Sequence, residues 1–215
     1  MPVALITGGE GFLARKIAKT LRADAYDVHA PSRRELDVSS VDSVEQWFST
    51  NADAYDLVIH AAGIADDALV SNMSSEQWDK VLAVNLRGAF LISRAAMRPM
   101  LKKRSGHIIF IGSFAGLSGT LGQANYAAAK AGLTGFAKSL AKEAGGRGVR
   151  VNCVLPGFLE SPMTKGLSDE LREAVREAHA LKRFNTGEEA AKFIAFLDTL
   201  SHVSGQVFQL DSRIG

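Results

Sequence analysis

The sequence HIIFIGSFAGLSGTLGQANYAAAK, residues 107–130, decides the interpretation of this chain. An apolar run ends at Gly112 and Ser113, a loop of small residues follows, and strong helix formers begin at Tyr126. Residues four apart share one face of a helix, so Tyr126 and Lys130 should project together. Because open α/β sheets bind ligands at the carboxyl ends of their strands, we expect Ser113 to lie in the same crevice.

A phenol, an ammonium and a hydroxyl in one crevice can move a proton to or from a substrate oxygen. The pKa of a free tyrosine, about 10, is too high for easy proton exchange near neutrality. A nearby ammonium favours the phenolate and lowers that pKa, while Ser113 can hold the substrate oxygen beside the phenol. A packed ring and a solvated lysine would show the same spacing, so the surrounding sequence has to separate the two interpretations.

Length and composition predict one domain, residues 1–215, with a substantial core. The net charge of +2 gives no electrostatic footprint for nucleic acid. We find no apolar run of about 20 residues to span a membrane, no signal peptide and no metal-ligand pattern. With Cys153 as the one cysteine, no internal disulfide can form, so we expect a reducing cytoplasm.

A glycine-rich turn near the amino end predicts a dinucleotide site. Strand, glycine turn and helix formers follow one another over residues 3–22, which is the context that the dinucleotide fingerprint requires. Glycines let the backbone approach a pyrophosphate, and the helix amino terminus supplies N–H donors. A plain strand-to-helix turn would contain similar glycines, so the motif alone leaves both interpretations open. The candidate cofactor residues here are Thr7, Gly8, Gly9, Glu10, Gly11, Phe12 and Leu13.

The segment after the second predicted strand, residues 26–30, is unusual. If residues 36–38 form the next parallel strand, only about five residues connect the two, where a dozen or more are expected. The crossover between strands 2 and 3 is then shortened to a loop. No acidic residue follows the second strand to hold a ribose 2′-hydroxyl. Ser32 and Arg33 stand there instead, which suits a 2′-phosphate and predicts NADPH over NADH. The alternative is that the arginines are solvated loop charges.

Strands and helices alternate through the rest of the chain. Strands are predicted at residues 56–60, 108–111, 149–155 and 206–210, and helices at 40–48, 75–100, 126–143, 168–180 and 188–200. The alternation predicts an α/β fold, a single Rossmann-type doubly wound parallel sheet of about seven strands with helices on both faces. Residues 158–183 follow the carboxyl end of a strand and form a candidate substrate lid.

Three polar or special residues stand out within these elements. Asn85 lies among apolar neighbours in a helix, where an unpaired amide is costly, so it is either structural or meets the active site. His60 sits inside an apolar run and is expected to be a packed strand residue. Pro99 should kink or end the helix at 75–100.

Together the glycine turn, Asn85, Ser113, Tyr126 and Lys130 resemble the short-chain dehydrogenase/reductase family over nearly the whole chain. From residue 102 onward the chain further resembles the β-ketoacyl-(acyl-carrier-protein) reductases of fatty-acid synthesis. The stretches that carry this second resemblance are GQANYAAAKAGL, VNCVLPGFLESPMT and SGQVFQLD.

The resemblance implies roles for individual residues. Tyr126 would protonate the carbonyl oxygen as hydride arrives from the nicotinamide, and Ser113 would polarise the carbonyl. Lys130 would hold the nicotinamide ribose and depress the pKa of Tyr126, while Asn85 would position a water in a proton relay. The implied cofactor contacts are Asp37 and Val38 beside the adenine, Ala61, Ala62 and Gly63 on the adenosine side, and Pro156, Gly157, Leu159 and Ser161 along the nicotinamide.

The resemblance also implies partners. Relatives assemble as a homodimer or homotetramer through the helix at 75–100 and the Tyr126 helix, and they act on an acyl thioester or an acyl carrier protein. An acidic carrier needs basic groups beside the crevice, and Lys102, Lys103 and Arg104 are candidates. The alternative is a solvated cluster at a helix end. The residues 211–213, Asp-Ser-Arg, stand where relatives usually have Asp-Gly-Gly.

The leading hypothesis is an NADPH-dependent reduction of a ketone to a secondary alcohol, with a 3-oxoacyl thioester as the favoured substrate. Fold and catalytic set do not name the substrate, so a reductase or dehydrogenase for another small ketone or alcohol is the alternative. A scaffold that binds a nucleotide or a partner without turnover is a second alternative. The four intact catalytic candidates argue against that scaffold.

Overall fold

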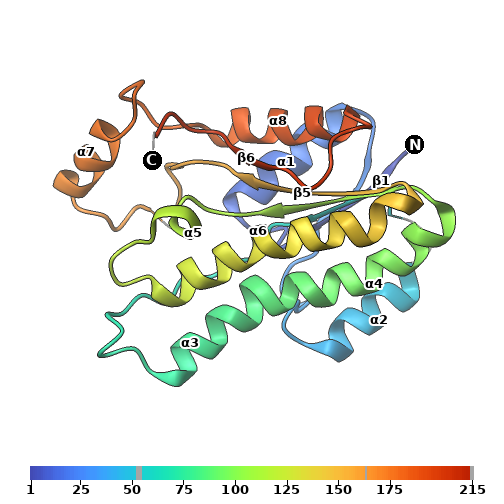
Figure 1. Ribbon diagram of the computed structural model, residues 1–215, viewed down its shortest axis with the longest axis horizontal. Helices are drawn as coiled ribbons and strands as arrows, with labels where there is room; N and C mark the ends of the chain where they lie inside the picture. The colour runs from blue at the N-terminus through green and yellow to red at the C-terminus, as the bar shows by residue number, and fades with distance from the viewer. Residues whose placement is uncertain (52–54, 163, 214–215) are drawn as a thin grey trace.

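The computed structural model describes residues 1–51, 55–162 and 164–213, and its centre is an all-parallel sheet of six strands in the order β2-β1-β3-β4-β5-β6 (Figure 1). The strands are β1 (Val3–Thr7), β2 (Asp27–His29), β3 (Leu57–His60), β4 (Gly106–Ile111), β5 (Val149–Leu155) and β6 (Val207–Gln209). The predicted α/β class and parallel sheet are confirmed, with six strands where about seven were expected.

Helices cover both faces of the sheet. In Figure 1, α1 and α8 lie above it, and α2, α3, α4 and α6 lie below it, while α7 stands at the left beyond the sheet. The helices are α1 (Phe12–Ala23), α2 (Val41–Asn51), α3 (Ser75–Leu82), α4 (Gly88–Lys103), α5 (Ala115–Ser118), α6 (Ala124–Ala144), α7 (Asp169–Glu177) and α8 (Gly187–Thr199). None of the described helices is long and apolar enough to cross a membrane.

Strand β4 shows why both faces need a cover. All six of its residues are buried. Successive strand side chains point to opposite faces, so Ile108 and Phe110 join the core under α4 and α6, whereas Ile109 and Ile111 join the core under α1 and α8. A continuous apolar strand of this kind is stable only between two helical layers.

Residues 36–38 do not form the predicted strand, so β2 is the edge of the sheet. They follow a turn in which the Ser32 carbonyl accepts hydrogen bonds from the amides of Glu35 and Leu36. Leu36 and Val38 are buried because they pack into the core under α2 and α4, not because they pair with a neighbouring strand. The crossover from β2 to β3 contains α2 and is not shortened to a loop.

The helix predicted at residues 75–100 is continuous but not uniform. Ser74 and Gln77 form a capping box at its start, and a π-helical turn (Ala83–Arg87) joins α3 to α4. Such turns often mark functional sites. Pro99 was expected to kink or end the helix, and it does not end it, because Pro99 lies inside α4, which continues to Lys103.

Candidate functional site

The carboxyl ends of the strands form one edge of the sheet, at the left in Figure 1, where α5 and α7 also lie. The chain order reverses beside β1, because β2 pairs on one side of it and β3 on the other. In open α/β sheets the crevice at such a reversal is the usual ligand site. The predicted catalytic residues come from elements that reach this edge.

Tyr126 and Lys130 project from the same face of α6, as their spacing predicts. The Lys130 Nζ lies 5.4 Å from the centroid of the Tyr126 ring. Lys130 is only 4% exposed, and its Nζ donates a hydrogen bond of 2.8 Å to the carbonyl of Ile111 at the end of β4. The lysine is therefore not the solvated charge of the alternative interpretation but a buried ammonium held between the phenol and the sheet.

Ser113 lies between β4 and α5, two residues beyond the carbonyl that holds Lys130. Its Oγ accepts a hydrogen bond of 3.2 Å from the amide of Ala115. The segment packs directly on α6, because a Cβ built on Gly116 would lie 2.8 Å from the carbonyl carbon of Lys130. The close approach at Gly116 brings the serine loop against the helix that carries Tyr126 and Lys130.

Asn85 was expected either to be structural or to meet the active site, and its hydrogen bonds support the structural role. The side chain is fully buried in the π-helical turn, and its Nδ2 donates to the carbonyls of Ile64 and Val81 at 2.8 and 2.9 Å. Its Oδ1 accepts from the Ile64 amide at 3.2 Å. A Cβ built on Gly63 would lie 2.7 Å from this Oδ1 and 3.4 Å from the Lys130 Nζ. Asn85 thus has a structural role, and its Oδ1 and the Lys130 Nζ both lie close to Gly63.

His60 is packed below this group, as predicted, and is 1% exposed. Burial first, and the Lys130 ammonium second, lower the pKa of His60 to about 3, so the ring is neutral at physiological pH. Its Nδ1 lies 3.2 Å from the Thr7 Oγ1, which also accepts a 3.1 Å hydrogen bond from the Ala62 amide. Thr7 and His60 therefore fix the ends of β1 and β3 against each other.

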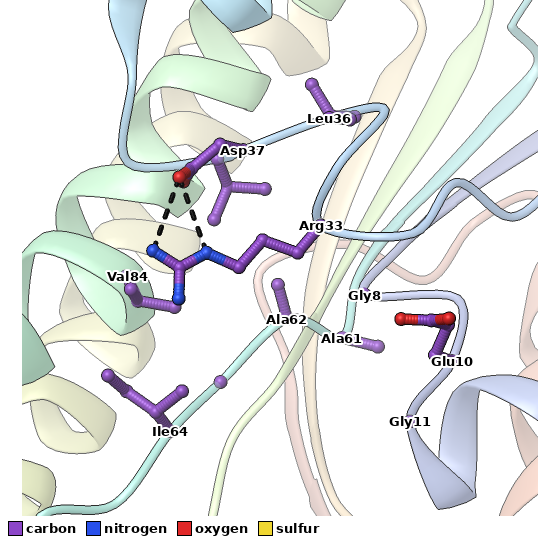
Figure 2. Close-up of a pocket in the computed structure, with 12 residues that line it drawn as sticks. Gly8, Glu10, Gly11, Arg33, Leu36, Asp37, Ala61, Ala62, Ile64 and Val84 are labelled. Atoms are coloured by element: carbon purple, nitrogen blue, oxygen red, sulfur yellow. Dashed lines mark hydrogen bonds and ion pairs between the residues drawn. The ribbon is translucent and has the colours of Figure 1, made fainter.

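A pocket of about 210 Å³ opens beside the glycine turn (Figure 2). Nine predicted cofactor residues line it, namely Gly8, Glu10, Gly11, Arg33, Asp37, Val38, Ala61, Ala62 and Gly63. Three further lining residues, Leu36, Ile64 and Val84, were missed by the sequence analysis. Ile64 and Val84 are direct neighbours of Gly63 and Asn85, and this adjacency was the available signal.

The glycine turn and the start of α1 fit the pyrophosphate of a dinucleotide. Gly8 has a φ of +66°, and a Cβ there would lie 2.8 Å from the Ala62 Cα, so the turn requires glycine. Gly11 is the N-cap of α1, which has no side-chain cap and no acidic residue in its first turn. The first amides of this 12-residue helix are therefore available to an anion.

Ser32 and Arg33, the residues predicted to bind a 2′-phosphate, are each bonded to an acidic side chain. In Figure 2 the Arg33 side chain reaches across the pocket, and its Nη2 lies 3.4 Å from the Asp37 Oδ2. Burial works to raise the pKa of Asp37, but hydrogen bonds from Ser39 and the Arg33 charge outweigh it, so that pKa is lowered. The Ser32 amide donates a 2.7 Å hydrogen bond to the Glu35 carboxylate.

The remaining predicted cofactor residues lie outside this pocket. Gly9 packs against Ala30, the residue after β2, because a Cβ built on Gly9 would lie 2.0 Å from the Ala30 carbonyl oxygen. Gly157, with a φ of +84°, packs against Asp211. The pocket is likewise not lined by Phe12, Leu13, Ser32, Pro156, Leu159 or Ser161. Thr7 does not line it either, but its Oγ1 accepts a hydrogen bond from the amide of Ala62, which does.

The basic cluster at residues 102–104 is not beside the crevice, where it was expected. It ends α4 and precedes the amino end of β4, whereas Ser113 follows the carboxyl end. The Lys103 Nζ bonds the Asp56 carboxylate at 2.8 Å, and the Arg104 guanidinium donates to the Gly146 carbonyl at 3.1 Å. These two side chains hold neighbouring loops together, which a sequence run of charges does not reveal.

Comparisons with known proteins found a matching family model and several curated relatives. A family model described as enoyl-(acyl carrier protein) reductase matches residues 10–212. The 3-oxoacyl-(acyl-carrier-protein) reductase FabG of Escherichia coli is 37% identical over 232 aligned positions, covering 97% of this chain and 95% of the relative. The same-named protein of Aquifex aeolicus is 40% identical, covering 96% and 85%. Nodulation protein G of a Rhizobium species is 36% identical, covering 98% and 96%.

Proposed function

The chain belongs to the short-chain dehydrogenase/reductase family, and we propose that it uses NADPH to reduce the ketone of a 3-oxoacyl thioester to a secondary alcohol. The observation that carries the proposal is the convergence of Tyr126, buried Lys130 and Asn85 beside a glycine-lined pocket. The names of the curated relatives support the substrate class.

Each side chain has a defined task in this proposal. The nicotinamide, when bound, supplies the hydride that reduces the carbonyl carbon. Tyr126 donates its phenolic proton to the carbonyl oxygen, and the Ser113 hydroxyl donates a hydrogen bond to the same oxygen. The Lys130 ammonium beside the ring favours the phenolate that remains and binds the ribose. Asn85 fixes the turn next to Lys130 and positions a water through which Tyr126 is reprotonated.

The test is turnover by the purified protein. We expect NADPH and a short 3-oxoacyl thioester to give loss of reduced-nicotinamide absorbance and a 3-hydroxyacyl product. Small ketones without a thioester serve as the comparison. Faster turnover of those ketones would show that small ketones, and not 3-oxoacyl thioesters, are the preferred substrates, while the protein would still be a reductase. Binding of NADPH without turnover of any ketone would instead favour a scaffold.

In the proposed natural substrate, the acyl group is attached by its thioester to an acyl carrier protein, as the names of the relatives suggest. A carrier-bound substrate should then show a lower KM than the same acyl group on a small thiol. Equal KM values for the two would mean that the carrier makes no contact with this protein.

The preference for NADPH is proposed from Arg33, which lines the pocket with its guanidinium largely exposed. A 2′-phosphate would compete with Asp37 for this guanidinium. We expect tighter binding of NADPH than of NADH, and Arg33→Ala should remove the difference. Arg34→Ala is the matched control, since this neighbouring arginine does not line the pocket. Equal affinities of the wild type for both cofactors would contradict the assignment.

A homodimer is proposed through the face formed by α3, α4 and α6. A groove of about 770 Å³ lies there, with Leu82, Leu86, Phe90 and Phe136 among its lining residues. Phe90 lines this groove and is 44% exposed. A second copy of the chain, packed by the same helices, would bury this apolar surface, as the family resemblance implies. A further contact through β6 would give a tetramer.

A further inference from the structure

The last described residues, 211–213, form a strap across the catalytic edge of the sheet. Asp211 lies against Gly157, because a Cβ built on Gly157 would be 2.7 Å from the Asp211 Cβ. Ser212 accepts a 2.9 Å hydrogen bond from the Ala180 amide through its carbonyl, and its Oγ accepts from the Leu181 amide at 3.1 Å. The strap therefore ties the loop after β5 to the segment that follows α7, within the predicted lid.

The centre of the strap is a buried ion pair. The Asp211 carboxylate is fully buried and accepts hydrogen bonds from the Arg213 Nε at 2.7 Å and from its Nη2. Gln209 donates a further 2.8 Å hydrogen bond to the same carboxylate. Burial works to raise the pKa of Asp211, but these hydrogen bonds and the Arg213 charge outweigh it, so the pKa is lowered. Asp211 is thus ionised and fixes the plane of the guanidinium.

The guanidinium in turn lies on a ring next to the catalytic serine. The Arg213 Cζ is 3.8 Å from the centroid of the Phe114 ring, the closest cation–ring approach among the described residues. Contacts of this kind are stronger when both partners are shielded from water, and only 13% of the Arg213 side chain is exposed. Phe114 directly follows Ser113 in the chain, so a contact that fixes Phe114 also limits the backbone of Ser113.

We propose that Arg213 is a positioning residue for Ser113, acting through Phe114, and that Asp211 holds Arg213 in place while Ser212 ties the lid to the same strap. The inference rests on the proposed role of Ser113 in polarising the substrate carbonyl. Arg213 itself touches no reacting atom. Its effect is to hold the serine hydroxyl where the carbonyl oxygen will be.

A double-mutant cycle on the full-length protein tests this role. Arg213→Met keeps the length of the side chain but removes the charge and the planar fork. A misplacement of about 1 Å at a catalytic group can cost about 100-fold in rate, so kcat should fall about 10- to 100-fold while the dissociation constant of NADPH is unchanged. In a Ser113→Ala background the same substitution should change kcat by less than about two-fold, because groups that act as a unit are not additive.

The matched control is Arg147→Met, an exposed arginine in the turn after α6 that precedes the amino end of β5. It should leave kcat on a small free thioester unchanged. Arg213→Lys keeps a cation over the ring but loses the bidentate fork, so it should give an intermediate kcat. If Arg213→Met loses its native circular dichroism, the cycle is run with Arg213→Lys. This variant should lower kcat by a smaller factor, again in the wild-type background and not in the Ser113→Ala background.

Hydrogen exchange gives a readout that does not need turnover. Arg213→Met should speed amide exchange at residues 113–119 and 178–182, and Arg147→Met should not. An unchanged kcat in Arg213→Met, an equal loss in the Ser113→Ala background, or unchanged exchange at residues 113–119 would overturn the inference. A wild-type protein that reduces no thioester would overturn the proposed function instead, and exchange would still decide whether the strap holds the Ser113 loop.

Discussion

Gly63→Ala tests whether Asn85 and Lys130 form one unit. The new Cβ would lie 2.7 Å from the Asn85 Oδ1, where ordinary contact begins at 3.4 Å, so the oxygen would have to move by about 0.7 Å. Its hydrogen bond from the Ile64 amide is already 3.2 Å long and should break. Asn85 cannot turn away freely, because its Nδ2 is bound to two carbonyls.

These distances set the size of the expected effects. Overpacking typically costs about 1–3 kcal/mol, and losing one hydrogen bond adds about 1 kcal/mol. We therefore expect the free energy of unfolding to fall by about 2–4 kcal/mol. Because the displacement occurs beside Lys130, kcat should fall about 10- to 100-fold, and by a larger factor than the affinity for NADPH.

The assay combines urea unfolding, steady-state kinetics and cofactor titration. Gly145→Ala is the control, because its backbone is helical and a Cβ there meets nothing within 4 Å. It should stabilise the protein by about 0.4–1 kcal/mol with kcat unchanged. A Gly63→Ala protein that is destabilised but turns over at the wild-type rate would refute the coupling of Asn85 to catalysis.

Three further predictions concern proton transfer, stability and assembly. Tyr126→Phe should lower kcat about 10²- to 10⁴-fold and leave NADPH binding by fluorescence titration unchanged, because only the proton donor is lost. Asp198→Ala should lower the free energy of unfolding, measured in urea, by about 3–5 kcal/mol. The mostly buried Asp198 carboxylate is hydrogen-bonded to His107, Arg150 and Tyr26. Burial works to raise the pKa of Asp198, but these hydrogen bonds, first that from His107, outweigh it and lower the pKa. That stabilisation is therefore complete above the unfolded pKa of about 3.9 and is lost as the pH falls through the lower folded-state pKa. The stability gap between wild type and variant should accordingly close on acidification. Phe90→Asp should give a monomer by light scattering, and a persisting dimer would place the interface elsewhere.

Local spacing was enough to predict that Tyr126 and Lys130 lie side by side. Tyr126 and Lys130 share a helix, so the four-residue interval alone places them on one face. The glycine turn could also be predicted, because it lies in the chain between a strand and a helix. Gly8 has a positive φ in the structure, a conformation that favours glycine. Both features depend on a few neighbouring residues, and both appear in the structure as expected.

Contacts between distant segments could not be predicted in this way. The alternation Leu36-Asp37-Val38 is typical of a strand, but a strand exists only where a neighbour offers hydrogen bonds, and these side chains pack under helices instead. The stack of Arg213 on Phe114 joins residues about a hundred positions apart, with no periodic signal in either segment. Such pairings follow from the closed fold and not from local propensity.

The position of β2 at the edge of the sheet has a consequence for engineering. An extra strand and helix inserted between β2 and α2 would extend the sheet outward, away from β3, β4 and β5. The alignment with the Escherichia coli relative has 232 positions, more than the 215 residues of this chain, so that relative carries residues that this chain lacks. Because Arg33, Leu36, Asp37 and Val38 of this crossover line the pocket, we expect such an insertion to be compatible with cofactor binding only where it leaves these four residues in place.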